Sequence, residues 1–225
     1  MKHETFEVLA KMFAIVNGAE GDSVPVEVVL EHLKRMTVLE LLPSKIGKFD
    51  IWDAISGKKE VGLNIEHKDG FMYASNSSSA FKIRADYDAN LEGKRVYKDG
   101  RIRSIYRFTF EDCIQSYKNL LEEKKRGIKI DWDRMKEVDK EARALKKILG
   151  RDYRPIVSIK GRLHFYYDDL LNFLKFMESH GIDAFEYYAG EGETVASIAE
   201  GSDGSVGVIV PLRGDFRQRR DVIKW

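Results

Sequence analysis

Two hydrophobic periodicities alternate along this chain, and their order limits the fold more than any other feature of the sequence. Residues 4–16 and 25–36 place apolar side chains three and four positions apart, which predicts two amphipathic helices. Residues 37–42, 48–55 and 60–67 are short apolar or β-branched runs, which predict three strands. Helices and strands mixed in this order favour an α/β (mixed α+β) fold.

The alternation continues through the second half of the chain. Thr109 and Asp112 resemble a capping box that begins a helix ending near Arg126, and Gly150 ends a second helix. The expected elements are a hairpin within 80–109, a strand at 128–132, a helix at 133–149, a strand at 155–166, a helix at 168–179, and strands near 182–188, 194–199 and 206–211. The last third therefore predicts a βαβββ unit, and Gly150 divides the chain into regions 1–150 and 151–225.

Composition excludes several functional classes. The net charge is +1, so any nucleic-acid site must come from local clustering of the 38 Lys and Arg residues. A single cysteine, Cys113, rules out an internal disulfide framework and predicts a reducing, cytoplasmic setting. No apolar run is long enough for a transmembrane helix, so no membrane partner is expected. The high charged fraction (33%) resembles thermophile usage.

One stretch, from Lys48 to Lys68, places three polar side chains in a pattern that suits metal chemistry. Side chains alternate between the two faces of a strand, so Glu66 and Lys68 are expected on one face and His67 on the apolar face. On the preceding predicted strand, Asp50 points away from its apolar neighbours. Asp50, Glu66 and Lys68 are therefore expected to converge, with His67 packed away from them.

This trio would suit phosphodiester hydrolysis. Two carboxylates, Asp50 and Glu66, can ligate Mg²⁺, which prefers oxygen ligands. The metal lowers the pKa of a bound water, and Lys68 can orient that water or stabilise the phosphate. The alternative for the same residues is a solvated sheet face on which Glu66 and Lys68 serve only strand pairing. Both interpretations stay open.

Residues 24–132 resemble the PD-(D/E)xK nuclease superfamily, through helix 24–37, Asp50 and the Glu66-x-Lys68 triplet. The resemblance implies an αβββαβ core, a nuclease-like domain over 1–150, and Glu31 as an accessory catalytic acid. It departs from the family pattern in two places. Phe49 stands where the family has proline, and about 40 residues separate Lys68 from the next expected helix.

Residues 163–213 resemble the last half-domain of a DNA sliding clamp. The pattern is strand, helix and three strands, ending in Val210-Pro211-Leu212-Arg213. A clamp encircles duplex DNA and has no catalytic residues, so this resemblance implies a non-catalytic DNA-binding protein and a possible homo-oligomer.

Basic and aromatic residues cluster in two further places. One is the expected hairpin, where Tyr97 and Tyr106 accompany arginines, and the other is the C-terminal tail, where Phe216 and Trp225 do so. Such clusters can bind phosphates and stack bases, although strand pairing and a solvated terminus explain them as well. The candidate nucleic-acid-binding residues are Arg101, Arg103, Arg107, Arg217, Arg219 and Arg220.

The sequence thus supports three hypotheses. The first is a Mg²⁺-dependent nuclease that hydrolyses DNA phosphodiesters, with Asp50 and Glu66 as metal ligands. The second is a non-catalytic DNA-binding protein of clamp-like architecture, and the third is an interaction protein without a nucleic-acid role.

Overall fold

The structure is a computed structural model. It describes residues 42, 44–55, 63–76, 78–105, 110–122, 125–188, 196–214, 216, 219 and 221–225. The helices predicted at 4–16 and 25–36, and the strand predicted at 37–42 except for Leu42, lie outside the described residues. Among the described helices, none is both long and apolar enough to cross a membrane.

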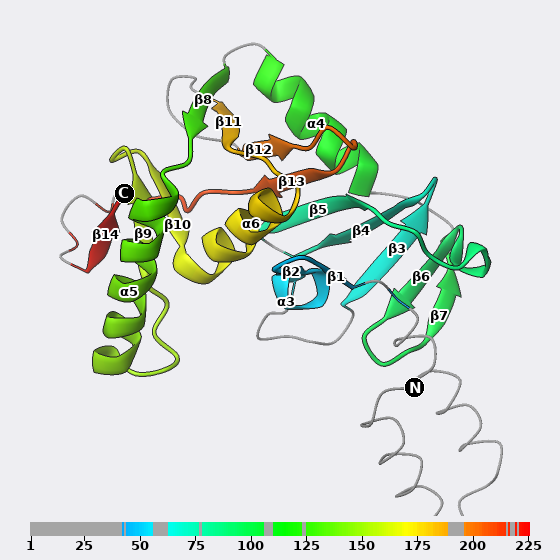
Figure 1. Cartoon of the computed structure of the whole chain (residues 1–225), viewed down its shortest axis with the longest axis horizontal. Coiled ribbons are helices and arrows are strands. Elements are labelled where there is room, and N and C mark those ends of the chain that lie inside the picture. The colour runs from blue at the N-terminus through cyan, green and yellow to red at the C-terminus, as the bar shows by residue number, and fades with distance from the viewer. Residues whose placement is uncertain are drawn as a thin grey trace, which may run out of the picture.

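Nine of the described strands form one antiparallel sheet that organises the molecule (Figure 1). In spatial order they are β7 (Ile102–Ser104), β6 (Lys94–Tyr97), β3 (Asn64–Lys68), β4 (Phe71–Ser75), β5 (Ser79–Arg84), β13 (Val206–Ile209), β12 (Ser197–Glu200), β11 (Ala184–Tyr188) and β8 (Lys125–Lys129). With the helices described below, this confirms the predicted α+β class.

The large sheet joins strands from both sides of Gly150. Strand β5 pairs with β13, with Phe81 opposite Gly207, and β8 pairs with β11, with Ile128 opposite Phe185. Sheet hydrogen bonds thus join regions 1–150 and 151–225. The division of the chain at Gly150 stays a prediction.

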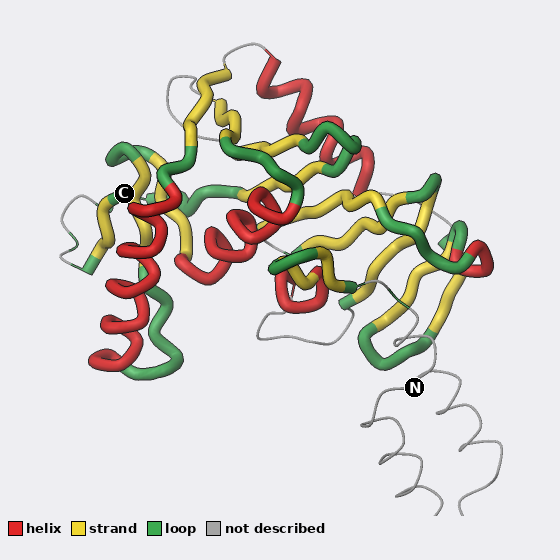
Figure 2. Tube along the Cα trace, in the orientation of Figure 1, coloured by secondary structure: helices red, strands yellow, loops and turns green. Residues whose placement is uncertain are grey.

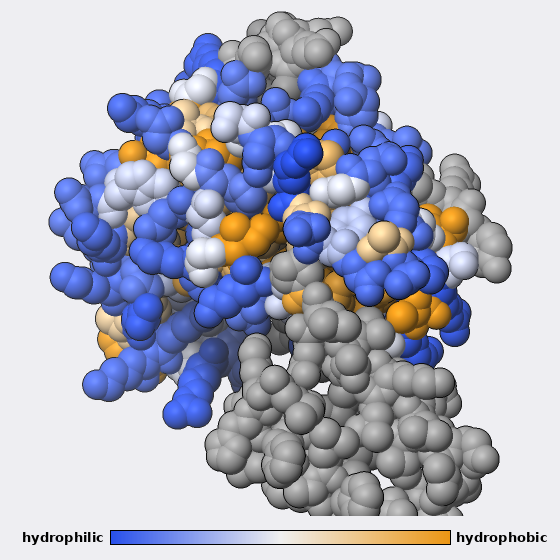
Figure 3. All heavy atoms as spheres, turned by 45° about the vertical axis from the view of Figure 1, so that its right-hand side comes forward, coloured by the Kyte–Doolittle hydropathy of each residue, from blue (hydrophilic) through white to orange (hydrophobic). Residues whose placement is uncertain are grey.

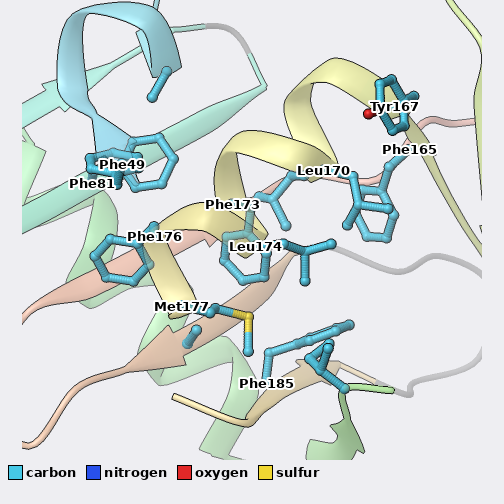
Figure 4. Close-up of a cluster of buried hydrophobic side chains, with 14 of the residues drawn as sticks. Phe49, Phe81, Phe165, Tyr167, Leu170, Phe173, Leu174, Phe176, Met177 and Phe185 are labelled. Carbon is cyan, nitrogen blue, oxygen red and sulfur yellow. The ribbon is translucent and has the colours of Figure 1, made fainter. Parts of the chain in front are cut away.

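Helix α6 (Tyr167–Ser179) packs on one face of the sheet through an aromatic cluster (Figure 4). The rings of Phe49, Phe81 and Phe176 lie 4.9–5.7 Å apart, and they connect β2 (Phe49–Asp50) and β5 to the helix. Gly207 on β13 is required here, because a Cβ at this position would lie 2.6 Å from Cδ1 of Phe176. The absence of a side chain at Gly207 therefore allows α6 to pack closely against β13.

Helix α4 (Phe110–Glu122) covers the opposite face, so the central strands are packed on both sides (Figures 1 and 2). Its Ile114 packs in a cluster with Val206 and Val208, whose side chains alternate with those of Gly207 and Ile209. A strand covered on both faces reads as a continuous apolar run, and all four residues of β13 are buried.

A second sheet of three strands lies beside the large one. Its order is β10 (Leu163–Tyr166), β9 (Ile156–Ile159) and β14 (Val222–Lys224), with β14 parallel to β9. Helix α5 (Trp132–Leu149) contacts β14, begins where Asp131 accepts hydrogen bonds from two backbone N–H groups, and ends at Gly150. The order β10-α6-β11-β12-β13 matches the βαβββ unit that we predicted, except that 155–166 is a hairpin rather than one strand.

The strand predicted at 48–55 is wrong. Only β2 (Phe49–Asp50) is extended, it pairs with β1 (Lys45–Ile46), and α3 (Ile51–Ile55) follows at once. The reason is local, since Oδ1 of Asp50 accepts hydrogen bonds from the backbone N–H groups of Trp52 at 2.9 Å and Asp53 at 3.4 Å. This is a helix N-cap, and the αβββαβ core is therefore not confirmed.

The hairpin predicted within 80–109 is formed by β6 and β7, while β5 pairs with β4 and β13. The turn at Lys98-Asp99-Gly100 is confirmed, and a short 3₁₀ helix, η1 (Ala89–Leu91), precedes it. Asp69 and Gly70, both at positive φ, form the two-residue turn between β3 and β4. Positive φ at both central positions is the geometry that fits the twist of a tight hairpin.

Candidate nucleic-acid interface

The two carboxylates predicted to share a metal belong to different sheets. Asp50 lies at the end of β2, which pairs with β1, whereas Glu66 lies on β3, between β4 and β6. The two strands therefore do not pair with each other, and the chain enters α3 directly after Asp50. Asp50 instead caps that helix.

Glu66 is a buried ion-pair partner. Its side chain is 1% exposed, and its Oε1 accepts hydrogen bonds from Nε of Arg95 at 2.7 Å and from Nη2 of the same guanidinium. Burial alone would lower the pKa of Arg95, but its hydrogen bonds to Glu66 and Tyr97 raise it above the ordinary arginine value. Glu66 therefore holds a permanently charged cation on β6.

Lys68 and His67 lie on opposite faces of β3, as predicted. Nζ of Lys68 is 3.9 Å from carboxylate oxygens of both Asp69 and Glu111. His67 is fully buried, and its ring lies 4.8 Å from that of Tyr87. This burial, which also lowers the pKa of His67, confirms it as a packed histidine rather than a base at the polar face.

The polar face of β3 continues across its neighbours as a basic surface. Residues directly opposite each other in an antiparallel pair share a face. Arg95 lies opposite both Glu66 and Arg103, while Lys68 lies opposite Phe71 and Phe71 opposite Arg84. We call this surface the basic sheet face, and it comprises Lys68, Lys82, Arg84, Arg95, Arg101 and Arg103.

Aromatic rings hold these cations in position. The guanidinium groups of Arg101 and Arg103 lie 5.1 and 5.7 Å from the ring centre of Tyr97. Nζ of Lys82 lies 4.4 Å from the ring centre of Phe71, and the guanidinium of Arg84 lies 5.5 Å from it. Cation–π attraction orients such groups without neutralising them.

Carboxylates compensate only part of this charge. Glu111, at the first turn of α4, is 3.4 Å from Nζ of Lys82, and Asp99 is 2.6 Å from Nε of Arg101. Arg84 and Arg103 are exposed to solvent. Helix α4 packs over β4, β5 and β11 on this side, whereas β6 and β7 extend beyond those strands to the sheet edge.

Five further predicted site residues remain, and the structure describes one of them, Arg219. Glu31, Arg107, Arg217 and Arg220 lie outside the described residues. Arg219 belongs to the region of the three-stranded sheet, where it pairs with Asp221.

A magnesium site needs ligands that are free to bind the ion. Among the described residues, no group of three or more His, Cys, Asp or Glu side chains is placed to hold a metal. Oδ1 of Asp50 caps α3, Oε1 of Glu66 accepts from Arg95, and the two residues lie on strands of different sheets. Their assignment as magnesium ligands stays a prediction.

Sequence reasoning missed Lys82, Arg84 and Arg95. A signal for Lys82 and Arg84 was present in the run AFKIRAD, where the two cations alternate with apolar residues, whereas Arg95 stands next to Lys94 in KRVY and no such alternation marks it. What could not be seen was that β5 and β6 lie on either side of the β3–β4 pair, because that order is set by tertiary pairing.

Comparison with known proteins gives a distant structural likeness and no family. No family model matches the sequence, and no curated protein matches it. One similar solved structure is assigned as a DNA polymerase III beta subunit from Eubacterium rectale, with 10% identity and a TM-score of 0.41 over 81% of this chain and 65% of that one. Another is the DNA polymerase III subunit beta from Pseudomonas aeruginosa, with 10% identity and a TM-score of 0.37 over 80% of this chain and 65% of that one. The chain thus matches just under two thirds of the length of each.

Proposed function

We propose that this chain is a non-catalytic DNA-binding protein that contacts the phosphate backbone through the basic sheet face. The observation that carries the proposal is the row formed by Arg95 and Arg103 on neighbouring strands, flanked by Arg101 and Lys68. Cations spaced along adjacent strands present several donors to successive phosphates. Contacts of this kind supply most of non-specific DNA affinity.

Pre-organisation supports the same proposal. Arg95 is held by Glu66, and Arg101 and Arg103 are held by Tyr97, so their side chains lose little freedom when a phosphate binds. Flexible arginine side chains lose conformational entropy when they bind a phosphate, and this loss weakens binding. An arginine held at its Nε edge or over a ring still has further N–H donors for a phosphate oxygen.

The geometry favours binding over hydrolysis. If Glu66 ligated a metal, its ion pair with Arg95 would have to break. The Arg95 guanidinium would then stay in a partly buried position without its carboxylate partner. That loss is costly, because breaking a buried ion pair leaves an uncompensated charge. The clamp-like assembly implied by the C-terminal resemblance stays part of this proposal.

The decisive experiment measures DNA binding as a function of salt. Fluorescence anisotropy with labelled single-stranded and duplex DNA should give a log Kd that rises linearly with log salt concentration. The double variant Arg84→Ala/Arg103→Ala should bind more weakly and show a salt slope smaller by about 1 for each lost phosphate contact.

A matched control removes the same charge elsewhere. Lys140 and Lys147 are exposed on α5, and the double variant Lys140→Ala/Lys147→Ala should bind DNA like the wild type. Equal loss in both double variants would point to net charge alone and contradict the proposed surface.

A further inference from the structure

A pocket of about 360 Å³ lies on the three-stranded sheet, separate from the basic sheet face. Its floor is one row of side chains across the three strands, since Ser158 on β9 lies opposite both His164 on β10 and Lys224 on β14. The alternate residues Val157, Phe165 and Ile223 point into the core instead. The row is thus fixed by strand register.

The floor is polar, and hydrogen bonds link its residues. Oγ of Ser158 lies 3.3 Å from Nε2 of His164, within hydrogen-bond distance. The backbone N–H of Trp225 donates to the carbonyl oxygen of Ser158 at 2.8 Å, and this hydrogen bond extends the pairing of β14 with β9 to Trp225. These contacts hold His164 and Trp225 at defined places around the pocket.

Aromatic and cationic groups form the rim. The ring of Phe216 lies 4.9 Å from that of His164, and both Phe216 and Trp225 keep part of their surface exposed. Arg219 and Lys224 are exposed as well, and Asp221 orients the guanidinium of Arg219. The pocket-lining residues that the structure describes include no acidic side chain. The pocket therefore combines flat apolar surfaces with the positive charge of Lys224 and with a guanidinium, that of Arg219, which Asp221 partly compensates (the three-stranded sheet is at the left of Figure 1).

We propose that this pocket binds one nucleoside monophosphate unit, with the base against Phe216 or Trp225 and the phosphate near Arg219 and Lys224. Base stacking on aromatic rings and charge-assisted contacts to phosphate are the two interactions that nucleotide sites combine. The volume lies at the lower end of the range of about 300–1,000 Å³ for small-ligand sites, so it suits one nucleotide rather than an oligomer. The unit is either a free nucleotide or the 5′-phosphorylated end of a strand.

This pocket is independent of the DNA-binding proposal above, because it shares no residue with the basic sheet face. The test is isothermal titration calorimetry of the full chain with adenosine 5′-monophosphate, and adenosine as the probe that lacks phosphate. The nucleotide should bind. Adenosine should bind more weakly by a factor of roughly ten or more, since it lacks the charge-assisted contacts.

Variants separate the two halves of the pocket. Phe216→Ala should weaken nucleotide binding roughly tenfold, whereas Phe216→Tyr, which keeps the ring, should preserve it. Lys224→Gln should weaken binding of the nucleotide but not of adenosine. Lys147→Gln on α5 is the control that removes a charge elsewhere and should bind like the wild type.

Short strands identify the source of the nucleotide. Competition by a 5′-phosphorylated oligonucleotide, but not by its 5′-hydroxyl form, would assign the pocket to strand ends. Lack of competition by either form, with the mononucleotide still bound, would assign it to free nucleotides. The proposal is overturned if the full chain does not bind the mononucleotide, or if Phe216→Ala and Lys224→Gln bind it as well as wild type. The variant Arg84→Ala/Arg103→Ala should keep this binding, so the two proposals fail separately.

Discussion

Arg95 and Glu66 form an ion pair between β6 and β3 in which the Glu66 side chain is buried and the Arg95 side chain is 30% exposed. The pair explains how an acid stands on an otherwise basic sheet face. Glu66 lies beneath the surface and orients the guanidinium above it, so the solvent-exposed charge of the pair is that of Arg95.

Removing Glu66 should destabilise the protein strongly. Glu66→Ala leaves Arg95 without its buried partner, and we expect the free energy of unfolding to fall by about 3–5 kcal/mol. Urea denaturation followed by circular dichroism measures it. The matched control is Glu178→Ala, whose exposed pair with Lys48 should be worth less than about 1 kcal/mol. Similar losses in the two variants would show that Glu66 and Arg95 are not coupled as described.

Magnesium should not make this chain a nuclease. Because Asp50 caps α3 and Glu66 binds Arg95, we expect no Mg²⁺-dependent cleavage of linear, branched or single-stranded DNA by the wild type. Gel electrophoresis of labelled substrates with and without EDTA measures this. Cleavage that needs Mg²⁺ and disappears in Lys68→Ala would establish the nuclease hypothesis instead. Lys118→Ala, on α4, is the charge-matched control.

Gly207 should tolerate no side chain. In Gly207→Ala the new Cβ would lie 2.6 and 2.7 Å from two ring atoms of Phe176, so the α6 interface must shift, at a cost of about 1–3 kcal/mol. Thermal and urea unfolding measure this. Gly127→Ala on β8 is the control, because its Cβ would meet no atom within 4 Å. Equal stability of the two variants would mean that α6 is not seated on β13 as the structure shows.

Asp169 should make the protein less stable at neutral pH than a neutral side chain would. Burial raises the pKa of Asp169 above its ordinary 3.8, against the opposing effect of Arg154. A raised folded-state pKa means that its stabilising contribution is present below the unfolded value and is lost as pH rises through the folded value. Asp169→Asn should therefore stabilise the protein at pH 7.

The pH dependence of that difference is the check. Unfolding free energies of Asp169→Asn and wild type should converge as pH falls below about 3.9, where Asp169 is protonated in both states. Asp183→Asn, an exposed carboxylate paired with Lys129, is the control and should show no such gain at pH 7. A destabilised Asp169→Asn at pH 7 would mean that the pair with Arg154 outweighs burial.

Local sequence signals predicted most of the described elements. Helices α4, α5 and α6 follow the 3.6-residue spacing of apolar side chains, and Gly150 ends α5 as expected. The turn at Lys98-Asp99-Gly100 and the C-terminal βαβββ order were also readable, since turn residues and strand alternation act over a few residues. The same reasoning failed at residues 48–55. There, Asp50 as an N-cap and buried Ile51, Ala54 and Ile55 at helical spacing outweigh a run that looks like a strand.

What the sequence determined by itself is the mixed α+β class, the positions of the long helices, and the burial of His67 opposite Glu66 and Lys68. Each depends on periodicity or on turn chemistry within one segment. Tertiary structure alone decided which strands became neighbours. It placed Arg95 against Glu66, across 29 positions of the sequence, and Lys224 beside Ser158, across a longer span. Pairing of distant strands depends on the packing of α4 and α6 on the two faces of the sheet. The free energy of that packing comes from contacts between segments that are distant in the sequence, so no local sequence pattern predicts it.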